Sequence, residues 1–189
     1  MDFSNQIIPV SESSGGTGVG LVNGGETIHQ GVEGAITLDI SQLLGWTKTS
    51  FAINSNVTYV DAHFEGDRQQ GGELLSGNVT PYAPNLLVNA AITLETYSGF
   101  GLRLGSNYVG KQYTDELNTA TATPDGRTGL ISAYHTVDAN VFYQIKPWKT
   151  TFSIGIKNIT DERYIVSRRP QGIRLGLPRL LTFGAELTF

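Results

Sequence analysis

The last nine residues of the chain alternate between apolar and other side chains up to the final residue. Every odd position is apolar, and every even position is polar or glycine. Successive side chains of a β-strand point to opposite faces, so the pattern predicts a strand with one apolar face and one face that tolerates water. Because the chain stops at an aromatic residue, we expect that residue to belong to the strand. The apolar positions are Leu181, Phe183, Ala185, Leu187 and Phe189.

The same two-residue alternation recurs along the whole chain. It predicts an all-β protein, an antiparallel up-and-down meander of about eight strands. The faces opposite the apolar ones carry amides, carboxylates and cations, such as Asn54, Asn89, Arg103 and Asp138, which cannot form a dry core. The predicted strands cover residues 3–10, 27–40, 48–62, 85–96, 99–112, 134–145, 149–160 and 178–189.

Composition excludes several classes of protein. The mean hydropathy is -0.12, and no apolar run approaches the roughly 20 residues of a membrane-spanning helix. A membrane β-barrel stays open, because alternating strands average to a neutral hydropathy. The chain has no cysteine, so it can form neither a disulfide nor a cysteine metal site. The net charge of -4 weighs against nucleic acid as a partner, and we expect no cofactor.

The connections between the predicted strands are alternately long and short. This asymmetry is typical of outer-membrane barrels, which have long extracellular loops and short periplasmic turns. A soluble β-domain explains the alternation of side chains but not the asymmetry of the loops. Tyr97 and Trp148 lie in short turns, where an interfacial aromatic girdle is expected. The long connections are residues 11–26, 63–84, 113–133 and 161–177, and the short ones are 41–47, 97–98 and 146–148.

Several segments resemble the C-terminal barrel of TonB-dependent outer-membrane receptors. The most specific are Asn158-Ile-Thr-Asp-Glu-Arg-Tyr164 and Gly176-Leu-Pro-Arg179, which leads into the last strand. Within the family the chain looks most like ferric-siderophore and ferric-dicitrate transporters. The other matching segments are Ile28-His-Gln-Gly-Val-Glu33, Pro81-Tyr-Ala-Pro84, Gly110-Lys-Gln-Tyr-Thr-Asp115 with Asn118-Thr119, and Arg168-Arg-Pro-Gln-Gly-Ile-Arg174.

The resemblance implies a function and a place in the cell. It implies a receptor of the bacterial outer membrane, not an enzyme, that takes up an iron chelate, either a siderophore or ferric citrate, with energy supplied through TonB. Family barrels have 22 strands and a plugged lumen. Residues 1–189 are therefore expected to form the C-terminal part of such a barrel, without the plug domain, the signal peptide or the TonB-contacting segment. Such a fragment, from an internal start or a truncated gene, would not transport alone.

The resemblance also implies partners. They are outer-membrane lipid and lipopolysaccharide, the ferric chelate, TonB through the missing N-terminal part, and the barrel-assembly machinery. Phe189, Leu187 and Phe183 look like the signal that this machinery recognises in a terminal strand. One alternative is a small complete outer-membrane barrel of structural or adhesive type, and a third possibility is a soluble β-domain.

Positive charge is concentrated before the last strand, although the chain as a whole is acidic. Arginine forks suit carboxylates and anionic ferric chelates, which makes Arg168, Arg169 and Arg174 the candidate ligand-binding residues of an outer loop. Salt bridges to neighbouring loops, or the phosphates of lipopolysaccharide, would explain the same charges. The complete set is Arg163, Arg168, Arg169, Arg174 and Arg179.

Other local patterns give little support for catalysis. Residues 105–111 match the start of a phosphate-binding loop, but Gln112 replaces the hydroxyl residue, and the segment continues a strand instead of opening a helix. The three histidines are scattered, so no metal site is predicted. A hydrolase site would need Asp115, His135 and a serine such as Ser132, which sequence alone cannot place together.

Overall fold

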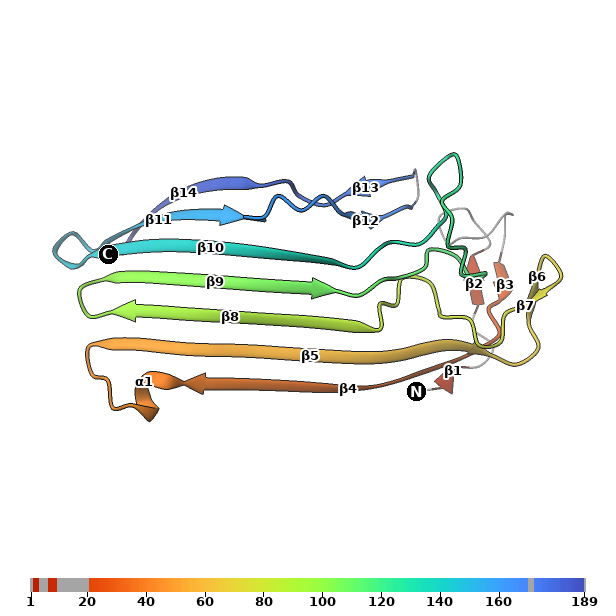
Figure 1. Cartoon of the computed structure of the whole chain (residues 1–189), viewed down its shortest axis with the longest axis horizontal. Coiled ribbons are helices and arrows are strands. Elements are labelled where there is room, and N and C mark those ends of the chain that lie inside the picture. Colours follow the sequence, from red (N-terminus) through yellow and green to blue (C-terminus); the bar gives the residue numbers. More distant parts are fainter. Residues whose placement is uncertain (1, 4–6, 10–20, 170–171, 189) are drawn as a thin grey trace.

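The computed structural model describes residues 2–3, 7–9, 21–169 and 172–188. Seven long strands of the described chain form one antiparallel sheet in chain order, with the short strand β1 (Asp2–Phe3) added at the edge (Figure 1). Each long strand pairs with its neighbours in the sequence, which confirms the predicted meander. The strands are β4 (Glu26–Asp39), β5 (Thr49–Glu65), β8 (Leu86–Thr96), β9 (Phe100–Val109), β10 (Tyr134–Ile145), β11 (Thr150–Lys157) and β14 (Leu180–Leu187).

None of the described helices is both long enough and apolar enough to cross a membrane.

The first predicted strand, residues 3–10, is wrong as a single strand. Phe3 ends β1, which pairs with β4, whereas β2 (Ile7–Pro9) pairs with β3 (Leu21–Asn23) in a separate two-stranded sheet. Proline has no N–H to give to a ladder, so a segment that contains Pro9 is poorly suited to a long central strand. Residues 4–6 and 10, which the prediction also covered, lie outside the described residues.

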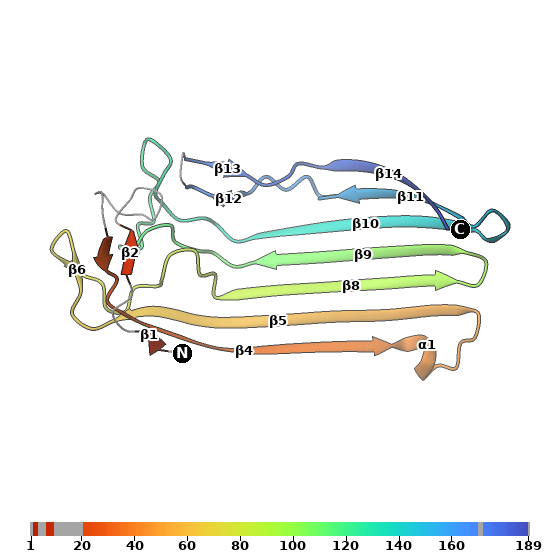
Figure 2. The same ribbon diagram turned by 180° about the vertical axis from the view of Figure 1, so that it is seen from behind.

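The remaining elements lie beyond the two ends of the long strands. Two short hairpins, β6–β7 and β12–β13, lie with β2 and β3 at the end of the long connections (Figures 1 and 2). The short turns at the other end contain α1 and the 3-10 turn η2. The bounds are Gln69–Gln70 for β6, Glu73–Leu74 for β7, Ile165–Ser167 for β12, Arg174–Leu175 for β13, Ile40–Leu43 for α1 and Lys146–Trp148 for η2.

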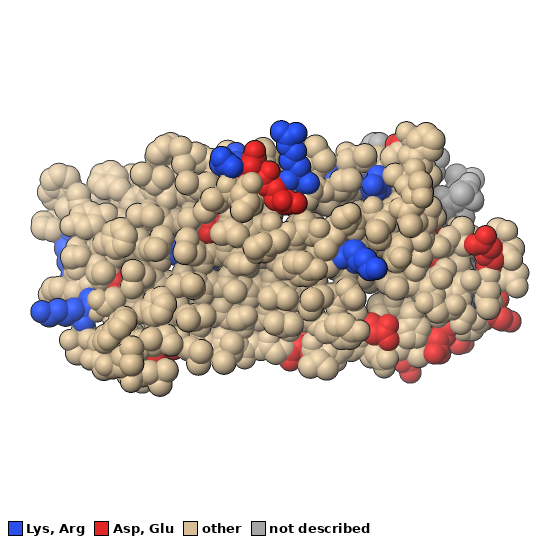
Figure 3. Space-filling view, in the orientation of Figure 1, with Lys and Arg blue, Asp and Glu red and all other residues tan. Residues whose placement is uncertain are grey.

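The register of the sheet separates a polar face from an apolar face. Asn89 of β8 lies directly opposite both Asn56 of β5 and Asn107 of β9. One residue earlier, Val88 lies opposite Val57 and Tyr108, on the other face. Figure 3 shows a face whose charged side chains lie mostly towards its margins, with few over the middle of the long strands.

The apolar face has no second layer among the described residues. Large hydrophobic side chains on it are open to the surroundings, and Val32 and Phe183 are each 73% exposed. The buried hydrophobic side chains of the described chain instead lie around the outer end of β5 and in the long loops. They are Ala62, Phe64, Leu75 and Ile131. The sheet is therefore built for an apolar solvent on one face, and protein packing is concentrated at one end.

The short turn between β4 and β5 is held by its first residue. The Asp39 carboxylate accepts a hydrogen bond from the Gln42 N–H at 2.9 Å and another from the Ser41 hydroxyl, so it caps the N-terminus of α1. The N–H of Leu44 then donates to the Ile40 carbonyl at 3.0 Å. This turn, the turn at Tyr97 and the turn at Trp148 confirm the predicted short connections.

Gly176 marks the point where the last long loop approaches the final strand. Its N–H donates to the Tyr164 carbonyl at 2.8 Å, and the Tyr164 ring stacks on Tyr134 with centroids 4.1 Å apart. A Cβ atom at Gly176 would overlap the Tyr164 ring. The ring cannot retreat without disturbing the stacked pair, so only glycine fits at this position.

We expect the Gly176→Ala substitution to destabilise the folded protein by about 1–3 kcal/mol, the range for overpacking. Gly34→Ala is the matched control, because a Cβ atom there meets nothing within 4 Å and both glycines have ordinary backbone angles. The thermal unfolding midpoint in detergent micelles measures both effects. Equal midpoints for the two variants would refute the packing argument.

Candidate functional site

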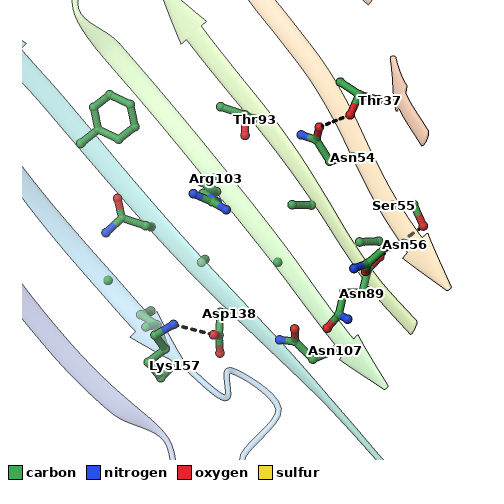
Figure 4. A pocket seen from close by; sticks show the side chains of 18 of the residues that line it. Thr37, Asn54, Ser55, Asn56, Asn89, Thr93, Arg103, Asn107, Asp138 and Lys157 are labelled. Carbon is green, nitrogen blue, oxygen red and sulfur yellow. Dashed lines mark hydrogen bonds and ion pairs between the residues drawn. The ribbon is translucent and has the colours of Figure 1, made fainter. Parts of the chain in front are cut away.

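The polar face of the sheet encloses a hollow of about 880 Å³. Side chains from β4, β5, β8, β9, β10 and β11 project into it (Figure 4). Because alternate residues of each strand point to this face, the hollow brings together residues that are far apart in the sequence. The polar ones include Thr37, Asn54, Asn56, Asn89, Thr93, Arg103, Asn107, Asp138 and Lys157.

Most of the polar groups that bond within this hollow do so across neighbouring strands. The Thr37 hydroxyl donates to the Asn54 side-chain oxygen at 2.9 Å. The Lys157 ammonium donates to Asp138 Oδ2 at 2.7 Å, and the Asn158 backbone N–H donates to Asp138 Oδ1 at 2.9 Å. The Asp138 carboxylate and the Lys157 cation therefore largely cancel each other's charge.

Arg103 is different from Lys157. It lies between Thr93 of β8 and Asn140 of β10 in the register of the sheet. No hydrogen bond or ion pair joins its guanidinium to another of the described residues, and the side chain is exposed in the hollow. Glu95 lines the same hollow nearer to the short turns. Besides this carboxylate, the hollow thus presents an unpaired guanidinium and several side-chain amides, which suit a small polar anion.

The β5–β8 and β9–β10 connections and the segment before β4 are joined to one another at the end of the sheet with the long loops. Arg68, between β5 and β6, makes a two-pronged ion pair with Glu116, with nitrogen–oxygen distances of 2.8 and 3.1 Å. Arg68 also donates to the Gly24 carbonyl at 3.0 Å, which ties in the segment before β4. Glu116 is only 6% exposed, so its carboxylate has lost most of its hydration, and the ion pair with Arg68 compensates for this loss.

Two side chains of the β9–β10 connection form hydrogen bonds with backbone groups that have left the β-ladders. The Asn118 side chain both accepts from the Val79 N–H and donates to the Val79 carbonyl, each at 2.8 Å. The Asp115 carboxylate accepts from the Thr119 hydroxyl at 2.7 Å and from the Thr119 N–H at 3.1 Å. Residues 110–119, which carried part of the family resemblance, therefore hold two of the long loops together by hydrogen bonds.

The segment from Asn158 to Tyr164 has a similar role at the last loop. Asn158 is 3% exposed, and its side-chain amide donates to the carbonyls of Glu162 and Leu177, both at 2.9 Å. The Asp161 carboxylate accepts from the Arg179 N–H at 3.0 Å. These bonds fix the point where the chain enters β14.

The three predicted ligand-binding arginines lie in different surroundings. Arg168 is 6% exposed, and its guanidinium donates to the carbonyls of Gly126 and Leu130 at 3.1 and 3.4 Å. Arg169 places its guanidinium over the Tyr82 ring, 4.8 Å from the centroid, and burial lowers the pKa of this guanidinium from its ordinary value. Arg174 is exposed on β13. Ligand contact by these residues stays a prediction.

The Tyr82 side chain joins the first two of these arginines. Its hydroxyl accepts the Arg168 backbone N–H at 3.2 Å, while its ring lies under Arg169. The structure therefore brings Arg168 and Arg169 to the loop before β8, while Arg174 lies opposite Ser167 on the β12–β13 hairpin.

The possible hydrolase residues do not form a triad among the described residues. His135 Nε2 lies 2.8 Å from the hydroxyl of Ser106, not Ser132, and Asp115 is engaged by Thr119. No group of three or more His, Asp or Glu side chains in the described chain could hold a metal ion. The stretch that resembles a phosphate-binding loop continues β9 instead of opening a helix, as predicted.

The residues of the predicted assembly signal lie on the last strand. Phe183 pairs in register with Ile154, and Leu187 pairs with Thr150. Phe189 lies outside the described residues. Recognition of this strand by the assembly machinery stays a prediction.

A family model described as TonB dependent receptor-like, beta-barrel matches residues 1–159. The chain belongs to this family. Its members are receptors and transporters of the outer membrane of Gram-negative bacteria, so this sheet is outer-membrane barrel wall. The end with the long loops is accordingly the outer end, and the end with the short turns faces the periplasm.

Solved receptors of the family have the same fold. The ferric citrate transporter FecA in its unliganded form has 27% sequence identity and a TM-score of 0.71, over 85% of this chain and 24% of its own. The siderophore receptor PiuA from Acinetobacter baumannii has 19% identity and a TM-score of 0.69, over 97% and 24%. The ferric yersiniabactin uptake receptor FyuA from Yersinia pestis has 23% identity and a TM-score of 0.65, over 88% and 24%. The chain thus spans about a quarter of the length of these receptors.

Two features of the site were not predicted. The two-residue alternation of β9 places Arg103 on the polar face. Only the structure shows that Lys157 is paired with Asp138, whereas Arg103 has no ion-pair partner among the described residues. The Arg68–Glu116 pair joins residues 48 positions apart, and no local pattern signals it.

Removal of Arg68 should loosen the outer loops. We expect Arg68→Ala to cost about 2–3 kcal/mol, because Glu116 would keep a largely buried, unpaired charge. Lys157→Ala, which breaks an exposed pair, should cost at most about 1 kcal/mol. The rate of proteolytic cleavage within residues 66–85 and the thermal midpoint report both changes.

The double variant Arg68→Ala with Glu116→Ala distinguishes the effect of losing the ion pair from the effect of losing the Arg68 side chain's packing. It should be more stable than Arg68→Ala alone, since the buried charge is gone. If the two losses simply add, the ion pair does not hold the loops.

Proposed function

We propose that the chain forms part of an outer-membrane receptor that takes up an iron chelate, ferric citrate or a siderophore, with energy supplied through TonB. The observation that carries the proposal is the polar hollow with the unpaired Arg103, in a chain 27% identical to a ferric citrate transporter. The likeness supports an anionic ferric ligand, and the hollow supplies groups that suit one.

The chemistry of the hollow favours passage of a small anion over tight binding. A guanidinium makes paired hydrogen bonds to carboxylate oxygens, and the side-chain amides of Asn56, Asn89 and Asn107 can replace part of the ligand's hydration. Lys157 is already engaged by Asp138, whereas Arg103 makes no ion pair with Glu95 or with any other described residue of this hollow, so its guanidinium is available to a ligand. One such charge attracts a chelate without trapping it.

The outer arginines would make the first contact. In this proposal Arg174 and Arg169 contact the chelate, because Arg174 is exposed and the Arg169 guanidinium is positioned over the Tyr82 ring. Arg168 acts as a positioning residue, since its guanidinium is committed to two loop carbonyls.

The proposal includes the partners and the architecture. Residues 1–189 would form the C-terminal part of the barrel wall, inserted by the assembly machinery through Phe183, Leu187 and Phe189, and surrounded by phospholipid and lipopolysaccharide. TonB would act through a plug outside this segment. A complete small barrel would need β14 to pair with the first strands, and these lie at opposite edges of the described sheet.

The central test is the charge of Arg103 in the receptor expressed from its native gene. Arg103→Gln should lower uptake of radiolabelled ferric citrate about 10-fold, since this corresponds to about 1.4 kcal/mol, close to the lower end of what one charge-assisted hydrogen bond contributes. Arg103→Lys should be intermediate, because it keeps the charge but not the fork. The matched control is Lys157→Gln with Asp138→Asn, which removes one paired charge of each sign from the same hollow and should leave uptake unchanged. Unchanged uptake by Arg103→Gln at low salt would refute this role.

The outer arginines need a binding measurement. We expect Arg169→Ala with Arg174→Ala to weaken the binding of an anionic ferric chelate about 10-fold at low ionic strength and less at high salt. Arg168→Ala should increase proteolysis of the 113–133 loop as well as weaken binding. If the double variant binds the chelate normally in low-salt buffer, these two residues are not ligand contacts.

A further inference from the structure

A second hollow, of about 470 Å³, opens where β5, β8 and β9 meet the outer loops. The wall on the strand side comes from Tyr59, Leu86 and Tyr108, and the wall on the loop side comes from Lys111, Leu130 and Ser132. It is separate from the polar hollow, with which it shares no lining residue.

The register places the strand side of this hollow on the apolar face of the sheet. Tyr59 lies directly opposite Leu86, and Tyr108 lies directly opposite Val88. Leu86 and Val88 are two residues apart on one strand, so all four side chains share a face, and it is the face opposite the asparagine row. The hollow is therefore continuous with the surface that contacts lipid.

The charge of the hollow is positive. Lys111 is exposed, and no carboxylate residue lines the hollow. The next acidic side chain along this face of β5 is Asp61, which is already engaged by the Gln30 amide and by His63 Nδ1, each at 3.1 Å. On the neighbouring strand, His135 is paired with the Ser106 hydroxyl. Lys111 thus has no competing carboxylate within the site.

The combination of groups fits an amphiphile at the outer surface of the membrane. Leucine side chains and tyrosine rings accept an acyl chain, whereas tyrosine and serine hydroxyls and an ammonium suit sugar hydroxyls and phosphate. Tyrosines are typical of the membrane–water interface, where one end of the side chain is apolar and the other wet.

We propose that this hollow binds the phosphorylated glycolipid of the outer leaflet, the lipid A part of lipopolysaccharide. Its acyl chain would lie against Leu86 and Tyr108, and its phosphate would meet the Lys111 ammonium. The site lies at the outer end, on the lipid-facing side, so this leaflet is the one it meets. The proposal goes beyond iron uptake and depends only on the outer-membrane location.

The test measures lipid retained by the purified receptor in neutral detergent, with lipid A added as the probe. Native mass spectrometry should show that Lys111→Gln retains lipid A about 10-fold less tightly than the unchanged receptor, whereas Lys111→Arg retains it. Lys149→Gln is the matched control, because Lys149 is also exposed but lies in a periplasmic turn. Folding of each variant is checked by heat-modified migration in electrophoresis.

Two further probes separate the phosphate from the apolar contact. Dephosphorylated lipid A and a neutral phosphatidylcholine should be retained equally by the unchanged receptor and by Lys111→Gln. Tyr108→Ala, which removes part of the apolar wall, should lower retention of both forms of lipid A. Equal retention of phosphorylated lipid A by Lys111→Gln and the unchanged receptor would overturn the proposal, as would equal loss in Lys149→Gln.

Discussion

Hydrogen bonding between the backbones of neighbouring strands is the constraint on which the rest of the structure depends. In the hydrocarbon of a bilayer no water can satisfy a free N–H or C=O, so each strand must find its partners in its neighbours. The ladder between β4 and β5 runs without interruption from Glu26 and Glu65 to Asp39 and Ala52. Once the ladders are complete, lipid solvates the apolar face, and side chains such as Val32 and Phe183 need no second layer of protein.

The same constraint explains why packing is concentrated in the outer loops. Outside the membrane the chain leaves the ladders, and its polar backbone groups need new partners. Buried amides supply them: Asn118 pairs with both backbone groups of Val79, and Asn158 binds the carbonyls of Glu162 and Leu177. The segments that carried the family resemblance thus hold the loops in place, and the resemblance reports architecture more directly than it reports a ligand.

Much of the fold follows from local pattern, whereas the site follows from it only in part. A period of two fixes which residues of a strand share a face, so the seven long strands and the polar face of the sheet were predictable, whereas the short strands β6, β7, β12 and β13 lie in segments that were predicted as loops. The prediction of a single strand over residues 3–10 is wrong because Pro9 has no N–H to donate to a neighbouring strand. The burial of Arg168 was not predictable, since its partners at Gly126 and Leu130 are about 40 positions away and offer only backbone carbonyls.

The contrast between Lys157 and Arg103 is the feature of the hollow that stability alone does not explain. A charge on the lumen face is best stabilised by a neighbour of opposite sign, and Asp138 provides this for Lys157. Arg103 has the uncharged Thr93 and Asn140 beside it in register, and it makes no ion pair with Glu95, the carboxylate further along the same face of β8. Natural sequences tend to break such local rules at functional positions. A guanidinium that is left without an ion-pair partner along the lumen wall is therefore better explained by an anion that passes than by the stability of the sheet.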